Sequence, residues 1–256
     1  MFWKLELSDE DTIKWMIGTY AWLLENFGGM KRVQRTKLVT PTPEDFPVLN
    51  SPNMGKAIFK IVQTNCGLEK WPCKLIMTTD RNAVAETMQF NNISGSGSDR
   101  AGAAGTFSKN GPLVTITYSM KQLEDPMSLV AVFAHELSHY LLHSHIELPP
   151  GGAKMEEHAT DLCAVFLGFG IFGANSCINF SQFTQGAMYG WSASRLGYLH
   201  VRDFAFALAI FAELKGLDNK QVLRHLKSDP KAYFKQSRKV IVKEWQTAID
   251  YLKTID

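Results

Sequence analysis

The chain has 256 residues, of which 45% are hydrophobic and 20% charged, so it is long and apolar enough to form a stable core without disulfides. Its 27 Lys and Arg residues nearly balance its 25 Asp and Glu residues, and the net charge of +2 gives no global field that would favour a nucleic acid or a membrane surface. The apolar content excludes a disordered chain, and 19 glycines and 10 prolines without a period exclude collagen-like and low-complexity classes.

No segment has the pattern of a targeting or membrane sequence. Met1–Glu10 carries four charges and no apolar stretch, so we do not expect a signal peptide. The most apolar segment, Leu162–Ile178, is shorter than the ~20 residues of a membrane span and contains three glycines. It is predicted to be a buried core helix that breaks at those glycines. The four cysteines form no C-x-x-C pair, so we expect buried thiols in a reduced, cytoplasmic protein.

Hydrophobic spacing and turn residues predict the secondary structure in chain order. The expected helices are Asp9–Phe27, Met54–Cys66, one opened by Asp125-Pro126, Met155–Phe169, His200–Lys215, Asp218–Lys227 and one from Asp229-Pro230 towards Leu252. A proline-rich connector, Pro41–Pro47, should lie on the core. Strands are expected over Cys73–Thr79 and Leu113–Tyr118, and the glycine-rich Asn91–Asn110 between them should be a mobile loop or hairpin tip. We therefore predict an α+β fold, mostly helical with a small sheet, in one domain spanning residues 1–256.

The helix opened by Asp125-Pro126 carries the sequence His135-Glu136-Leu137-Ser138-His139. Histidines at i and i+4 lie on one helical face, where both imidazoles can bind one zinc ion. The glutamate after the first histidine can then take a proton from a water at the open position of the metal. Chance would place this H-E-x-x-H pattern in such a chain only about 0.01 times. The pattern predicts a Zn²⁺ site with His135 and His139 as ligands and Glu136 as general base.

A third ligand is expected from the next predicted helix. Glu157 and Asp161 are four residues apart and so share a helical face. In such an arrangement the glutamate binds the metal and the aspartate holds the second nitrogen of a histidine ligand. Glu156 is the nearest competitor, although the spacing to Asp161 favours Glu157.

His145 is a rival third ligand, because it lies ten residues after His135 as in the metzincin pattern H-E-x-x-H-x-x-G-x-x-H. The glycine that would let the helix turn back is replaced by Leu142. We therefore expect the helix to continue and to carry His145 past the metal.

The stretch Ala134–His143 closely resembles the active-site helix of the ImmA/IrrE-like group of gluzincins, the class of zinc metallopeptidases that includes thermolysin and the HtpX-like enzymes. Glu157 and Asp161 match the E-x-x-x-D of the second gluzincin helix, so the resemblance covers about residues 113–170. It departs from that class in the glycine-rich apolar stretch Phe166–Gly173. The resemblance implies a zincin-like active-site helix under an edge strand to which a peptide substrate adds. Leu113–Tyr118 is placed to be that strand, or else a plain core strand.

Peptide hydrolysis also needs a donor for the developing oxyanion. Four residues of a glycine-containing segment are candidates: Tyr189, Arg195, Tyr198 and His200. The basic residues near the C-terminus lack the aromatic pattern of a nucleic-acid surface and are expected to be a solvated helix face. The sequence thus predicts a zinc-dependent metallohydrolase acting on a peptide or protein. The alternative is a non-catalytic regulatory protein that keeps the metal site, against which the intact Glu136 argues.

Overall fold

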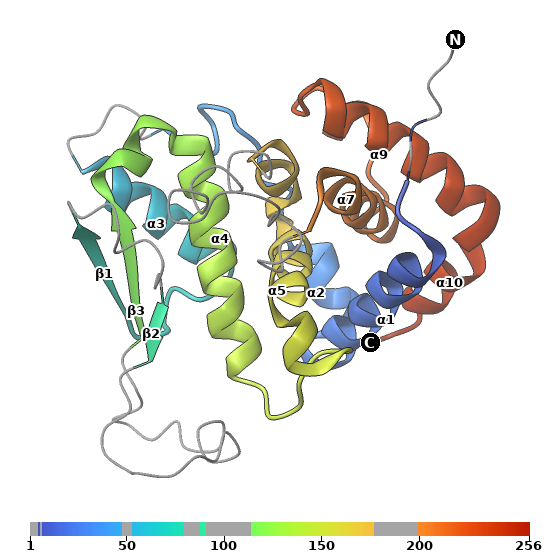
Figure 1. Ribbon diagram of the computed structural model, residues 1–256, viewed down its shortest axis with the longest axis horizontal. Helices are drawn as coiled ribbons and strands as arrows, with labels where there is room; N and C mark the ends of the chain where they lie inside the picture. The colour runs from blue at the N-terminus through green and yellow to red at the C-terminus, as the bar shows by residue number, and fades with distance from the viewer. Residues whose placement is uncertain (1–4, 6, 48–52, 79–87, 91–113, 177–198) are drawn as a thin grey trace, which may run out of the picture.

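The computed structural model describes residues 5, 7–47, 53–78, 88–90, 114–176 and 199–256. A small sheet lies at one end of the molecule, and helices α1, α7, α9 and α10 lie at the other (Figure 1). Helices α4 and α5 run side by side between these two parts (Figure 1). The fold is mostly helical with a small sheet, which confirms the expected α+β class.

The N-terminal helices follow the predicted pattern with one addition. Helix α1 (Glu10–Asn26) begins after Asp9, whose carboxylate accepts a hydrogen bond from the Thr12 amide at 2.8 Å. Gly28 takes a left-handed conformation (φ 97°) and ends that helix. A second, unpredicted helix, α2 (Gly29–Arg35), starts at the next residue. Helix α3 (Met54–Asn65) was expected, and it buries Ile58 and Val62.

The proline-rich connector lies on the core, as predicted for it. Phe46 is buried and packs its ring edge-on against Phe172, with centroids 5.5 Å apart. The Asp45 carboxylate accepts hydrogen bonds from the Thr40 amide at 2.7 Å and from the Lys37 ammonium. These contacts hold the connector in place.

The sheet has three strands in the order β1 (Cys73–Thr78), β3 (Val114–Ser119), β2 (Met88–Phe90). Strand β3 pairs parallel with β1 along its whole length and antiparallel with β2 from Val114 to Ile116. Of the two roles left open for Leu113–Tyr118, the edge strand is therefore wrong, and Val114–Tyr118 is the core strand of the alternative. The chain between the two predicted strands supplies β2, a strand too short to show a periodic signal, and this makes β3 central. Asn91–Asn110 and Leu113 lie outside the described residues.

Helix α4 (Pro126–His143) follows β3 after a single 3₁₀ segment, Met120–Glu124. Asp125 caps it by accepting the Ser128 amide at 3.1 Å, and proline at the first position suits the fixed φ of a helix start. Its Phe133 side chain packs edge-on against Tyr118 of β3 and Phe59 of α3. Since α4 is buried around most of its circumference, it acts as the central support of the fold.

Helix α5 (Glu156–Ala164) returns antiparallel to α4 after a turn with left-handed Gly151 and Gly152 (Figure 1). It continues as a π-helical segment, Val165–Phe169, and then as residues 170–176. Gly168 interrupts the helix with φ 95°, which confirms the predicted break at a glycine. The helical span Gly152–Ser176 is long and apolar enough to cross a membrane, but 89% of its apolar window is buried inside the protein. It is a helix of the core.

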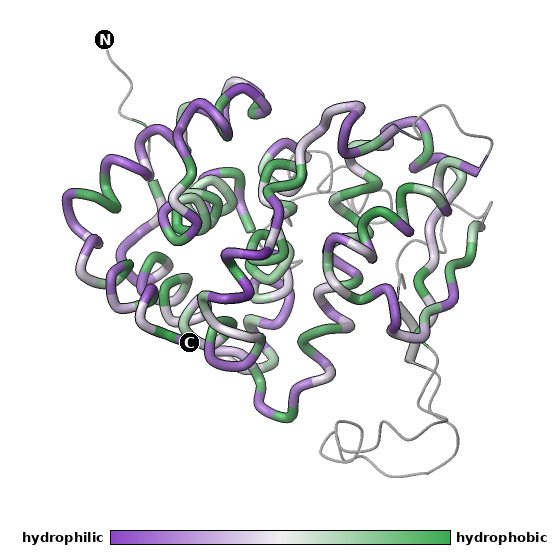
Figure 2. The backbone as a smooth tube through the Cα atoms, turned by 180° about the vertical axis from the view of Figure 1, so that it is seen from behind, coloured by the Kyte–Doolittle hydropathy of each residue, from purple (hydrophilic) through white to green (hydrophobic). Residues whose placement is uncertain are grey.

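The C-terminal part supplies the remaining helices. They are α7 (Val201–Lys215), α8 (Asn219–Leu223), α9 (Ser228–Val240), a π-helical segment Ile241–Trp245 and α10 (Gln246–Leu252). Helix α7 is buried along almost its whole length, and α9 packs on its outer side. Figure 2 shows α7 as a largely apolar tube, whereas α9 alternates between polar and apolar residues. The described residues share one hydrophobic core.

Candidate metal site

Helices α4 and α5 run antiparallel, and polar residues of successive turns of α4 lie opposite polar residues of α5. His143 on the last turn of α4 faces Glu156 on the first turn of α5, with 2.8 Å between Nε2 and Oε1. One turn further in, His139 meets Glu157 and Thr160. One more turn in, His135 meets Asp161. The four-residue spacing on α4, and the spacing of three and four residues from Glu157 to Thr160 and Asp161 on α5, keep the inner pairs on the facing sides of the two helices.

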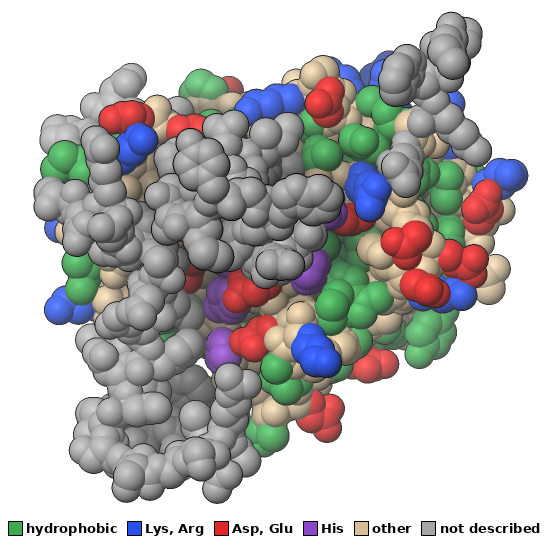
Figure 3. Space-filling model, in the orientation of Figure 1, with side chains coloured by type: hydrophobic (Ala, Val, Ile, Leu, Met, Phe, Trp, Pro, Cys, Tyr) green, Lys and Arg blue, Asp and Glu red, His purple; other side chains and the backbone are tan. Residues whose placement is uncertain are grey.

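Three ligand atoms converge on one point of this interface. The Nε2 atoms of His135 and His139 each lie 3.3 Å from the same Glu157 oxygen, Oε2. Two imidazole nitrogens and one carboxylate oxygen at such mutual distances could hold a single metal ion. Figure 3 shows histidine and carboxylate side chains gathered near the centre of this face of the molecule.

Both imidazoles are oriented through their other nitrogen. The Nδ1 atom of His135 lies 2.8 Å from Oδ1 of Asp161, which as a carboxylate can only accept, so this nitrogen carries the proton. Thr160 donates its hydroxyl proton to the Glu156 carbonyl oxygen at 2.8 Å and therefore accepts from His139 Nδ1 at 3.1 Å. Each Nε2 is thus the nitrogen available to a cation, the tautomer that metal binding requires.

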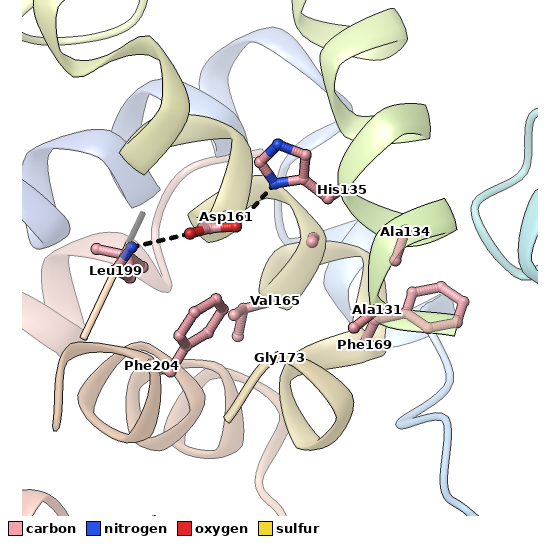
Figure 4. A pocket seen from close by; sticks show the side chains of 10 residues that line it. Ala131, Ala134, His135, Asp161, Val165, Phe169, Gly173, Leu199 and Phe204 are labelled. Carbon is pink, nitrogen blue, oxygen red and sulfur yellow. Dashed lines mark hydrogen bonds and ion pairs between the residues drawn. The ribbon is translucent and has the colours of Figure 1, made fainter. Parts of the chain in front are cut away.

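Asp161 also fixes the chain that leads into α7. Its second oxygen, Oδ2, accepts a hydrogen bond from the Leu199 amide at 2.9 Å (Figure 4). The carboxylate is buried, at 4% exposure, between His135 and this amide. One side chain therefore connects α4, α5 and the start of α7.

A small cavity of about 20 Å³ adjoins His135 and Asp161 on the inner side (Figure 4). Its other walls are apolar and include Phe169, Leu199 and Phe204. A space of this size holds a single water molecule and no substrate side chain. Among the described residues, the ligand cluster is open towards solvent on the Glu157 side, where that side chain is 41% exposed.

The electrostatics of the site favour a cation. Burial alone would lower the pKa of His135, but hydrogen bonds to Asp161 and Glu157 outweigh it and raise this pKa to about 10. Burial would likewise raise the pKa of Glu157, yet its contacts with the two histidines hold it well below its ordinary value. Carboxylates that attract a proton to an imidazole this strongly also attract a metal ion to it.

Glu136 lies beside the ligands on the same helix and is buried, at 6% exposure. Its negative charge acts on His135 and contributes to the raised pKa of that histidine. Within the described part of the chain, no hydrogen bond or ion pair engages the Glu136 carboxylate. It is a buried carboxylate next to the ligand cluster without a structural partner among these residues, as a general base would be.

The alternative ligands are placed elsewhere. Glu156 pairs with His143, so Glu157 is the glutamate that reaches both His135 and His139. Helix α4 ends at His143, and His145 packs in the following turn against Trp22 and Phe27, with ring centroids 5.5 and 5.9 Å away. His145 is not in the ligand cluster.

Of the oxyanion candidates, Tyr189, Arg195 and Tyr198 lie outside the described residues. His200 is exposed and precedes the first residue of α7. It directly follows Leu199, whose amide binds Asp161. The segment that carries the candidates therefore re-enters the described structure beside the site.

Sequence reasoning gave no role to Thr160 or to His143. Thr160 could have been found from its position, because residues 157, 160 and 161 share one face of a helix. His143 could have been found as the third member of an i, i+4, i+8 series with His135 and His139. Neither residue type in isolation signals a metal site.

Comparison of the chain with protein-family models, with curated proteins and with solved structures finds no match. The likeness of the α4 and α5 segments to gluzincin helices therefore stays a prediction from the sequence. Any functional conclusion depends on the arrangement of His135, His139, Glu157 and their neighbours.

Proposed function

We propose that this protein is a zinc-dependent metallohydrolase and that peptides are its substrates. The observation that carries the proposal is the convergence of two imidazole Nε2 atoms on one Glu157 oxygen, with both Nδ1 atoms engaged by Asp161 and Thr160. Peptide is the substrate class that the resemblance of residues 134–143 to a metallopeptidase helix implies.

The donor set suits zinc. Two histidines and one glutamate are a common ligand set of catalytic zinc sites, in which a fourth position stays open for water or substrate. A closed structural zinc site would take four protein ligands, and the cluster in the described residues has three. When bound at such a site, zinc lowers the pKa of a coordinated water to about 7 and polarises a carbonyl group.

The chain's own residues supply the remaining functions. His135, His139 and Glu157 would hold the ion, while Asp161 and Thr160 keep the imidazoles in the required tautomer. The Glu136 carboxylate would accept a proton from the attacking water and deliver it to the leaving amine. Its burial beside His135 keeps competing water away from this proton transfer.

The proposal is tested by Glu136→Gln, which keeps the side-chain shape and leaves all three ligands in place. Both forms are loaded with zinc, incubated with a peptide library, and assayed by mass spectrometry for new N-termini. We expect equal zinc content and equal thermal stability, with cleavage reduced by about 10²–10⁴-fold, the usual contribution of a general acid–base.

Glu147→Gln is the matched control, because Glu147 is exposed and lies outside the ligand cluster. This control should cleave as the wild type does. Equal cleavage by the Glu136→Gln variant would show that the activity has another source. A zinc-loaded wild type that cleaves nothing would support the non-catalytic metal-binding alternative.

A further inference from the structure

A second group of possible ligands lies one helical turn outside the first. His143 and Glu156 form a close pair, with 2.8 Å between Nε2 and Oε1. His139 completes the group, because one ligand atom from each of the three residues lies within 4.8 Å of the others. The rings of His139 and His143 have centroids 6.0 Å apart and are inclined by only 31°. The proposed catalytic site uses neither His143 nor Glu156.

The helix register explains why this group exists. His143 continues the i, i+4 series of α4 and therefore lies about 6 Å further along the helix axis than His139. Glu156 and Glu157 are consecutive, so their side chains leave α5 in directions about 100° apart. One carboxylate thus meets His135 and His139, and the other meets His143.

The two groups differ most in their second histidine, since the inner carboxylate, Glu157, is itself 41% exposed. The His143 side chain is 44% exposed and that of Glu156 is 24% exposed, whereas the His135 side chain is only 8% exposed. A cation can therefore reach His143 and Glu156 from solvent directly. Two imidazoles and a carboxylate form the same donor set as the inner site, with a preference for borderline divalent ions such as Zn²⁺.

The two groups share His139. Its Nε2 atom faces Glu157 at 3.3 Å, and its Nδ1 atom is engaged by Thr160 at 3.1 Å. A cation in the outer group and a cation in the inner group therefore compete for one imidazole. The inner group has the more buried second histidine, His135, and Asp161 orients that imidazole, so the inner group holds the ion more tightly.

We infer that His143 and Glu156, with His139, form a second divalent-metal site that captures an ion at the surface and passes it to the inner site. This loading role rests on the zinc site proposed above, whereas the existence of the outer site does not. His143 and Glu156 would hold the ion first, with His139 as a third ligand. His135 and Glu157 would then replace the two outer ligands, one helical turn further in.

The test begins with metal-free full-length protein titrated with Zn²⁺ by calorimetry. The wild type should bind one tight equivalent at the inner ligands, which then occupy His139, and one weaker equivalent held by His143 and Glu156 alone. His143→Ala and Glu156→Gln should each lose the weaker equivalent and keep the affinity of the tight one. Glu157→Gln should lose the tight equivalent and keep the weaker one. Glu147→Gln, an exposed carboxylate outside both groups, should keep both.

Uptake kinetics then test the loading role, with Co²⁺ as the probe and its visible d–d absorption as the stopped-flow signal. His143→Ala and Glu156→Gln should slow filling of the inner site by about tenfold, the lower range for loss of a supporting group at a metal site. The final absorption spectrum should match that of the wild type, since the inner ligands are intact.

The results that would overturn the inference are distinct. If the wild type binds only the tight equivalent and His143→Ala takes up Co²⁺ at the wild-type rate, the outer site is refuted while the proposed inner zinc site is still supported. Loss of the tight equivalent in His143→Ala would make His143 a ligand of the main site and refute the two-site arrangement. A wild type without a tight equivalent would refute the proposed zinc site, and the loading role with it.

Discussion

Asp161 offers the sharpest test of how the site is built. Its two oxygens accept one hydrogen bond from His135 Nδ1 at 2.8 Å and one from the Leu199 amide at 2.9 Å. Asp161→Ala removes both acceptors, so the His135 Nδ1 donor and the Leu199 amide each lose this hydrogen bond. Each hydrogen bond to a charged group stabilises the fold by about 1.5–3 kcal/mol, and two such bonds are lost. The variant also no longer has to bury a charged carboxylate, and this gain offsets part of the loss. We therefore expect the metal-free variant to lose about 2–4 kcal/mol of unfolding free energy.

Asp161→Asn separates the structural contribution from the control of the tautomer. The asparagine side chain ends in one oxygen, which accepts hydrogen bonds, and one NH₂ group, which donates them. When the oxygen accepts from the Leu199 amide, the NH₂ group must therefore face His135. That arrangement keeps both hydrogen bonds when His135 moves its proton from Nδ1 to Nε2. The proton then occupies the atom that must bind the metal. Asn should therefore be milder than Ala in stability and at least as harmful to metal affinity, with a loss of about 10–100-fold.

The assay pairs two measurements on the wild type and both variants. Zinc affinity is measured by competition with a chromophoric chelator, and the stability of the metal-free protein by urea unfolding. If Asp161 matters only for packing, both properties should rank in the order wild type, Asn, Ala. Zinc binding by Asp161→Asn within about threefold of wild type, below the range for such groups, would refute the tautomer argument.

Three further predictions concern other parts of the structure. Thr160→Val should weaken zinc binding by about tenfold because His139 Nδ1 loses its acceptor, whereas Thr160→Ser should bind as wild type in the same chelator assay. Asp45→Asn should destabilise the protein by about 1–2 kcal/mol at neutral pH. Burial tends to raise the pKa of Asp45, but hydrogen bonds from Lys37 and Thr40 outweigh burial and lower this pKa below its ordinary value of 3.8. The ionised carboxylate therefore stabilises the fold above pH 3.8, and this stabilisation is lost as the pH falls through the lowered pKa. Urea unfolding at a series of pH values should show the loss in the wild type and not in Asp45→Asn. Gly168→Ala should lower the free energy of unfolding by more than about 3 kcal/mol, because φ is 95° and a Cβ would collide with the Lys37 carbonyl oxygen. Gly18→Ala should raise it by up to about 1 kcal/mol, because Gly18 lies in α1 with open space around it. Thermal denaturation that ranks the two variants alike would contradict this pair of predictions.

Much of the helical framework could be predicted from the sequence because its signals are local. Asp9 and Asp125-Pro126 mark helix starts through capping chemistry that acts within three residues. The facing positions of Glu157 and Asp161 follow from helical periodicity alone. The pairing of these two residues with α4 required only that the two helices lie side by side, which a short connection between them favours.

The features that sequence reasoning missed depend on contacts between distant segments. Strand β2 has only three residues, too few for alternation to appear, and its pairing with β3 decides that β3 is central. Helix α2 begins directly after a glycine that was expected to end helical structure. At Gly168 the break itself was predicted, but the contact that holds it was not. The Gly168 carbonyl accepts the Val39 amide at 3.0 Å, so the kink at this glycine is held by a segment some 130 residues earlier.

Packing at both ends of α5, outside the ligand residues, also holds the orientation of this helix. Before its first turn, the Trp15 indole of α1 donates to the Pro150 carbonyl at 2.8 Å. Beyond its last turn, Gly168 is locked against the segment at Val39. Contacts outside the site therefore contribute to the rotation of α5 about its axis, which aims Glu157 and Asp161 at α4. In small zinc domains the ion itself supplies the folding energy. Here the core already places the three ligand atoms within 4.8 Å of one another, so the binding energy of an ion is left for coordination and chemistry instead of folding.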